Sequence, residues 1–179
     1  AGHSLGEYTA LVASGVLNLS DAVKIVRKRG QLMQSAVPTG IGSMKVLNFP
    51  LGCDVSSKFE DVKKSCNYFG IDLANLNSPR QIVLSGPVDS LQDAAESSRS
   101  LFSGDEVPDI IDIPVSAPFH SRGMKSIESD FKDYISSFSF NLSNVDRVFS
   151  NRTGKLHTRS EFFDNLVSQI SSPVLWIDN

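Results

Sequence analysis

The clearest chemical signal lies at the start of the chain. Gly2-His3-Ser4-Leu5-Gly6 matches Gly-x-Ser-x-Gly, the spacing of a nucleophile elbow, in which a tight turn exposes a serine at the start of a helix. Glycine on each side of the serine would leave room for that turn. The backbone N–H of Leu5, at the helix N-terminus, could then stabilise an oxyanion. The pattern is short, and an ordinary Gly/Ser turn is an equal alternative to a catalytic serine.

A serine nucleophile needs a base, and elimination leaves His120 as the candidate. His3 lies inside the elbow and is expected to point away from the exposed side of the serine, and His157 lies in a polar loop and is expected to face solvent. His120 follows a strand and the turn at 116–119, which puts it at a loop tip, where catalytic residues concentrate. The alternative is a surface or helix-capping histidine.

Arg29 is a cation on an apolar stripe of a predicted helix over 21–37. It lies three residues after Val26 and four before Met33, in step with the 3.6-residue period of the stripe. A buried guanidinium needs an anionic partner. The periodicity by itself favours a structural salt bridge, with Glu7 as a partner. The alternative is a site for a ligand carboxylate, which the planar guanidinium would bind through two hydrogen bonds.

The elements that must position these residues fall into an outer and a central part. In the outer part we predict helices over 5–14, 21–37 (with Ser20 as N-cap), 123–138 and 160–170 and a strand over 147–150. In the central part we predict strands over 43–49, 71–76, 81–85 and 109–115 and helices over 55–66 and 88–101. The central order β-α-β-β-α-β is that of a ferredoxin-like unit. We therefore predict an α/β fold whose core is formed by 1–40 and 116–179, with a ferredoxin-like subdomain inserted at 41–115.

Composition and charge exclude several other classes. The 179 residues carry 17 Lys+Arg and 20 Asp+Glu, a net charge of −3, whereas a nucleic-acid-binding protein usually has a basic excess. No stretch approaches the ~18 continuous apolar residues that a membrane-spanning helix needs. Cys53 and Cys66 are too few for a disulfide framework or a four-ligand zinc site, which favours a reducing intracellular compartment.

Five parts of the chain, in the same order, carry a family resemblance. They are Gly2–Tyr8, Arg29–Gln34, Asn75–Pro79 with Val83–Gly86, Pro114–His120 with Met124, and Gln169 with Ser172–Trp176. In these parts the sequence resembles the malonyl-CoA:acyl carrier protein transacylase family, which includes the acyltransferase domains of fatty-acid and polyketide synthases. The family fold is an α/β-hydrolase-like core with an inserted ferredoxin-like subdomain, which agrees with the prediction above.

The resemblance implies acyl transfer through a malonyl-serine intermediate. Ser4, activated by His120, would take the malonyl group from malonyl-CoA and pass it to the phosphopantetheine thiol of acyl carrier protein. Both thiol carriers are substrates, and no cofactor or metal is expected. The backbone carbonyl of Gln169 would orient the histidine, and Arg29 would hold the free carboxylate of malonate, which selects malonyl over acetyl. The remaining substrate-binding residues implied by the resemblance are Met33, Asn77 and Phe119, the last of which fits the malonyl rather than the methylmalonyl pattern.

The chain also departs from the family pattern. The family has a strand leading into the serine and an upstream Gly-Gln-Gly-like segment that gives a second oxyanion donor, and neither is present. We therefore expect this fragment to be weakly active or inactive and its parent protein to be a transacylase. Two alternatives are a serine esterase or thioesterase that uses Asp109 or Asp112 as its acid, and a non-catalytic fragment that binds the carrier protein. We expect a monomer that binds neither nucleic acid nor membrane. It would be mitochondrial or plastid if eukaryotic, and cytoplasmic if bacterial.

Overall fold

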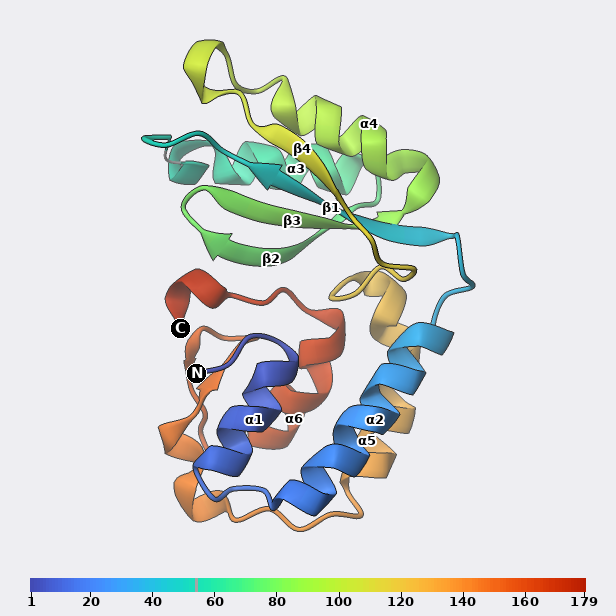
Figure 1. Ribbon diagram of the computed structural model, residues 1–179, viewed down its shortest axis with the longest axis vertical. Helices are drawn as coiled ribbons and strands as arrows, with labels where there is room; N and C mark the ends of the chain where they lie inside the picture. The colour runs from blue at the N-terminus through green and yellow to red at the C-terminus, as the bar shows by residue number, and fades with distance from the viewer. Residues whose placement is uncertain (54) are drawn as a thin grey trace.

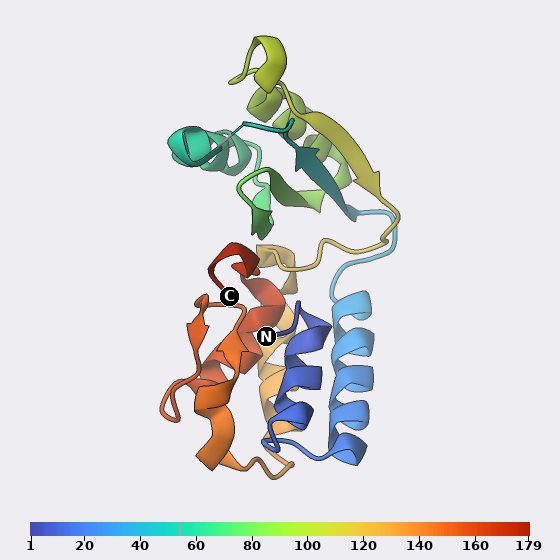
Figure 2. The same ribbon diagram turned by 60° about the vertical axis from the view of Figure 1, so that its left-hand side comes forward.

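Two lobes stack along the long axis of the computed structural model, which describes residues 1–53 and 55–179 (Figures 1 and 2). The helical lobe contains α1 (Leu5–Ala13), α2 (Leu19–Ser35), α5 (Glu128–Ile135) and α6 (Phe162–Ser168), with a short hairpin of β5 (Phe149–Ser150) and β6 (Lys155–Leu156). The sheet lobe contains β1 (Gly42–Asn48), α3 (Phe59–Tyr68), β2 (Asp72–Ser78), β3 (Gln81–Pro87), α4 (Val88–Arg99) and β4 (Asp109–Ile113). The predicted α/β class is confirmed.

The helical lobe is held together by one apolar core. Each helix turns an apolar face inward, and Leu11, Ile25, Phe131 and Leu166 are all fully buried there. On α2 the predicted stripe is the buried face, and Arg29 is buried with it. The burial of these faces, at roughly 25 cal/mol per Å² of apolar surface, is the main force that fixes α1 against α2.

Several predicted boundaries in the helical lobe and its neighbour were wrong. α2 begins at Leu19, and its N-cap is Asn18 rather than Ser20, because the Asn18 side chain accepts a hydrogen bond from the N–H of Asp21. The predicted helices over 55–66 and 123–138 begin instead as 3₁₀ turns, Val55–Lys58 and Arg122–Ile127. A further 3₁₀ turn, Leu142–Arg147, shortens the predicted strand at 147–150 to two residues.

The sheet lobe has the predicted element order and a single antiparallel sheet. Its strands are ordered β2-β3-β1-β4, and each neighbouring pair is antiparallel. α3 and α4 lie together on one face of the sheet (Figure 1), and a second apolar core that includes Leu47, Ile71, Leu84 and Leu91 fills the space between them. The opposite face is turned toward the helical lobe (Figure 2).

Several contacts join the two lobes next to the residues of interest. The segment before the C-terminus runs alongside β2, where Val174 and Asn75 form a parallel bridge. The carboxylate of Asp72 on β2 binds the side chain of Arg122, with oxygen and nitrogen 2.7 Å apart. The ring of Pro118 lies against Gly42, the first residue of β1, where an added Cβ would be 2.4 Å from its Cδ. Among the described residues, none of the helices combines the length and the apolar character that crossing a bilayer requires.

Candidate active site

Ser4 lies in a strained turn directly before α1. Its φ of 50° and ψ of −101° are rarely adopted by residues other than glycine. Glycine is required on one side of the turn only. A Cβ on Gly2 would lie 2.0 Å from the carbonyl oxygen of Gly6, whereas a Cβ on Gly6 would meet no atom of the described residues within 4 Å. The expectation that both glycines are sterically required was therefore wrong for Gly6, whose carbonyl is the crowded group. Leu5 is the first residue of α1, so its N–H lies at the helix N-terminus.

His120 and Gln169 complete a linear hydrogen-bond chain with this serine. The Nδ1 of His120 donates to the backbone carbonyl of Gln169 over 2.8 Å, which fixes the ring proton on Nδ1. The Nε2 atom is then the acceptor for the Ser4 hydroxyl, 2.7 Å away. A carbonyl thus occupies the place that a carboxylate holds in a Ser-His-Asp triad. The two aspartates considered for an esterase lie elsewhere, since Asp109 and Asp112 are exposed on β4.

Arg29 reaches the same serine from α2. Its Nη2 donates to the Ser4 Oγ over 2.8 Å and to the side-chain oxygen of Gln169 over 2.9 Å. The predicted salt bridge with Glu7 was wrong: among the residues that the structure describes, Arg29 bonds to the Ser4 hydroxyl and the Gln169 side chain and forms no ion pair with a carboxylate. The Glu7 carboxylate instead accepts hydrogen bonds from three other groups of the chain. Burial lowers the pKa of Arg29, and the neighbouring Glu7 and Tyr8 oppose that shift.

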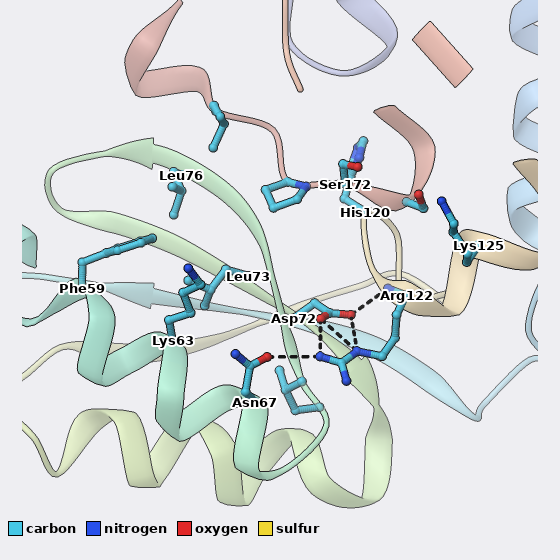
Figure 3. Close-up of a pocket in the computed structure, with 14 residues that line it drawn as sticks. Phe59, Lys63, Asn67, Asp72, Leu73, Leu76, His120, Arg122, Lys125 and Ser172 are labelled. Atoms are coloured by element: carbon cyan, nitrogen blue, oxygen red, sulfur yellow. Dashed lines mark hydrogen bonds and ion pairs between the residues drawn. The ribbon is translucent and has the colours of Figure 1, made fainter. Parts of the chain in front are cut away.

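Two cavities meet at His120. The smaller, of about 310 Å³, is lined by residues from both lobes: His3, Ser4, Arg29, Gly30, Met33, Met44, Asn75, Ile113, Phe119 and His120. The larger, of about 460 Å³, extends between the lobes, past Lys63, Arg122 and Lys125 (Figure 3). The serine and the guanidinium therefore face one small chamber, and the imidazole forms a wall of both cavities.

Two of the predicted residues lie differently from the prediction. His3 does not point away from the serine but lines the smaller cavity with it, because the side chain of Asn77 accepts a hydrogen bond from its Nε2 over 2.9 Å and Trp176 packs against its ring. Asn77 supports His3, and it is Asn75 from the same strand that lines the cavity. Met33 and Phe119 also line the cavity.

The protonation state of His120 follows from its surroundings. Burial lowers the pKa of His120 to about 3, and the positive charge of Arg29 acts in the same direction. The imidazole is therefore neutral at pH 7, with a free lone pair on Nε2 facing the serine hydroxyl. That is the form in which a histidine can accept a proton from a nucleophile.

Comparison with known proteins identifies a family for this chain. The family model described as acyl transferase domain matches residues 1–177. The chain belongs to the acyl transferase domain family. This confirms the resemblance found in the sequence.

Individual relatives of this acyl transferase domain carry more specific names. A malonyl CoA-acyl carrier protein transacylase of Staphylococcus aureus is 43% identical over 181 residues, which cover 99% of this chain and 56% of that protein. The solved malonyl CoA-acyl carrier protein transacylase of Clostridium perfringens is 34% identical, with a TM-score of 0.82 over 98% of this chain and 53% of its own. A malonyl-transacylase solved with its type II polyketide-synthase acyl-carrier protein is 29% identical, with a TM-score of 0.83 over 97% of this chain and 54% of its own. The chain spans about half the length of these relatives.

Sequence reasoning missed Asn151, gave Glu7 the wrong partner and misplaced His157. Asn151 lies beside the elbow, where its side-chain oxygen accepts from the N–H of Ser4 over 2.6 Å. Glu7 is fully buried on α1. His157 was expected to face solvent but is only 2% exposed, because its Nε2 donates to the Glu7 carboxylate over 2.8 Å. These partners are 144 to 150 residues apart in the chain, so no local pattern could have revealed them.

Proposed function

We propose that the protein transfers a malonyl group from malonyl-CoA to the phosphopantetheine thiol of acyl carrier protein, through a malonyl ester on Ser4. The observation that carries this proposal is the position of Arg29. Its guanidinium is buried and lies 2.8 Å from the Ser4 oxygen. A malonyl group esterified at that oxygen would hold its free carboxylate within reach of the guanidinium. The printed names of the relatives support the same substrate and the same acceptor.

The proposed reaction has two half-reactions at one dyad. As the Ser4 oxygen bonds to the thioester carbon, its proton moves to Nε2 of His120, and the N–H of Leu5 stabilises the oxyanion. When the carbon–sulfur bond breaks, the CoA thiolate takes the proton back from Nε2. The phosphopantetheine thiol then gives its proton to Nε2, attacks the ester carbonyl and receives the malonyl group, and Ser4 regains its proton.

The cavities fit this sequence of substrates. The chamber of about 310 Å³ would hold the malonyl group. The larger cavity of about 460 Å³, with Lys63 and Lys125 on its wall, would admit the pantetheine arm from the side of the carrier protein (Figure 3). The carrier protein's partner role is supported by a relative solved with its acyl-carrier protein. The monomeric state and the intracellular compartment stay predictions.

We also propose the finer classification of the fold. The antiparallel order β2-β3-β1-β4, with two helices on one face, supports a ferredoxin-like unit over 41–115. The strained serine turn before α1 supports an α/β-hydrolase-like core over 1–40 and 116–179. The two separate apolar cores support the division between them.

Radiolabelled malonyl-CoA tests the proposed function. The full-length protein should take up one malonyl group on Ser4 and release it when holo acyl carrier protein is added. Labelling of Ser4 by a neutral acyl ester but not by malonyl-CoA would favour the esterase alternative. Binding of the carrier protein without any labelling would favour the non-catalytic fragment. Comparing residues 1–179 with the full-length protein tests the expectation that the fragment is weakly active, and equal rates would contradict it.

A further inference from the structure

A second layer of buried polar residues lies behind the serine and the histidine. Glu7, Asn151 and Gln169 are 0% exposed, and His157 is 2% exposed. The proposed reaction uses only the backbone carbonyl of Gln169 from this set. A buried carboxyl group such as that of Glu7 is costly unless hydrogen bonds satisfy it. The hydrogen-bond donors that satisfy the Glu7 carboxyl group show which parts of the site this residue holds.

The Glu7 carboxylate collects donors from three distant parts of the chain. Its Oε2 accepts from the backbone N–H of Asn151 and from the side-chain nitrogen of Gln169, both over 2.9 Å. Its Oε1 accepts from Nε2 of His157 over 2.8 Å. One side chain on α1 thus fixes the residue after β5, the end of α6 and the residue after β6 relative to each other. His157, held against the ring of Phe162, fixes the carboxylate in turn.

The two residues that Glu7 anchors hold the reacting groups. Asn151 grips the elbow from both sides, since its side-chain oxygen accepts from the N–H of Ser4 and its side-chain nitrogen donates to the carbonyl of Gly2 over 3.0 Å. Gln169 contacts the rest: its side-chain nitrogen donates to the carbonyl of Ser4, its side-chain oxygen accepts from Arg29, and its backbone carbonyl accepts from His120. Ser4, Arg29 and His120 are therefore each linked to Glu7 by hydrogen bonds through one intervening residue, Asn151 or Gln169.

We propose that Glu7, fixed by His157, is the positioning residue of this site. It acts through Asn151 and Gln169 to hold the strained turn at Ser4 and the ring of His120 in reacting geometry. Strained backbone of this kind persists only where the surroundings over-determine it. The choice of malonyl-CoA as one substrate below rests on the proposed function, but the positioning role itself concerns only the reactivity of Ser4.

Paired variants separate positioning from simple packing. Glu7→Ala removes the acceptor for all three donors. Glu7→Gln keeps one oxygen for the donors from Asn151 and Gln169, and its amide nitrogen can donate to Nε2 of His157 once that ring carries its proton on Nδ1. His157→Gln keeps a donor near the position of Nε2, whereas His157→Phe keeps a ring without the donor.

Two readouts are needed, and one of them requires no natural substrate. The first is the rate at which phenylmethanesulfonyl fluoride modifies Ser4, and the second is kcat and KM with malonyl-CoA and holo acyl carrier protein. A displacement of about 1 Å in a reacting group can cost about 100-fold in rate. For Glu7→Ala we expect losses approaching that size in the modification rate and in kcat, with KM for malonyl-CoA changed by less than about threefold. Glu7→Gln should recover most of the loss.

The outcomes that overturn the proposal are specific. A folded Glu7→Ala protein whose Ser4 is modified at the wild-type rate refutes it, and so does a rise in KM with kcat unchanged. If thermal unfolding shows that Glu7→Ala does not fold, the His157 pair decides: a loss with Phe that Gln restores supports positioning, and wild-type rates in both refute it. A full-length wild-type protein that reacts with the sulfonyl fluoride but transfers no malonyl group overturns the proposed function alone.

Discussion

If the proposed function holds, replacement of Arg29 by alanine should remove a preference for malonyl over acetyl groups. The guanidinium is 6% exposed and lies 2.8 Å from the oxygen that would carry the acyl group. In so buried a place, loss of one partner of an ion pair costs about 3–5 kcal/mol. At about 1.4 kcal/mol per tenfold, kcat/KM for malonyl-CoA should fall by roughly 100-fold to 5,000-fold.

The same substitution should affect acetyl-CoA much less. An acetyl group has no carboxylate, so it leaves the buried cation unpaired in the wild-type protein and gains nothing from it. The assay is a competition between differently radiolabelled malonyl-CoA and acetyl-CoA, read as acyl groups on Ser4 in the full-length protein. Arg27→Ala on the exposed face of the same helix is the matched control and should leave the ratio unchanged. An equal loss on both substrates would refute a carboxylate-binding role, because it would show that Arg29 serves the dyad alone.

Gly2→Ala should abolish the reactivity of Ser4 toward a sulfonyl fluoride, because the new Cβ would lie 2.0 Å from the Gly6 carbonyl oxygen. Gly6→Ala should keep that reactivity and raise the free energy of unfolding by about 0.5–1 kcal/mol. Burial lowers the pKa of His120 to about 3 in the folded state, compared with about 6.5 in the unfolded chain. Between these two pH values only the unfolded state binds the extra proton. The free energy of unfolding is therefore highest above about pH 6.5 and falls as the pH is lowered, by about 2 kcal/mol at pH 5. Urea unfolding at pH 7.5 and pH 5 checks this, and His120→Gln should flatten the difference. Asp72→Ala should lower the free energy of unfolding by about 1 kcal/mol or less, since its ion pair with Arg122 is partly exposed, and a thermal melt that drops far more would show that this contact holds the lobes together.

The parts of the site that have local signatures were predictable from the sequence. The turn at Ser4 needs a small residue two positions earlier, and residues 2–6 match the short sequence motif that indicates such a turn. Arg29 follows from helical periodicity, which reports burial wherever the apolar stripe is regular. The sheet lobe was predicted in its element order because its strands and helices alternate with clear turn residues between them.

The parts that depend on distant contacts were not predictable. Periodicity showed that Arg29 is buried but not what it touches, and the favoured partner, Glu7, proved to serve His157 and Asn151 instead. His157 lies in a stretch of polar residues, and polarity normally indicates exposure. Its burial depends on a single carboxylate about 150 residues away, which only the folded chain brings within reach.

The wall of the smaller cavity has a consequence for how acyl preference can change. The groups that make and break bonds come from the helical lobe, whereas Met44, Asn75 and Ile113 in the same wall come from strands of the sheet lobe. One side of the chamber is thus encoded in a different stretch of sequence from the serine and the histidine, while Arg29, Met33 and Phe119 of the helical lobe form the other side. Exchanging residues 42–113 for the matching stretch of a relative would therefore reshape the chamber while leaving the nucleophile and its base in place.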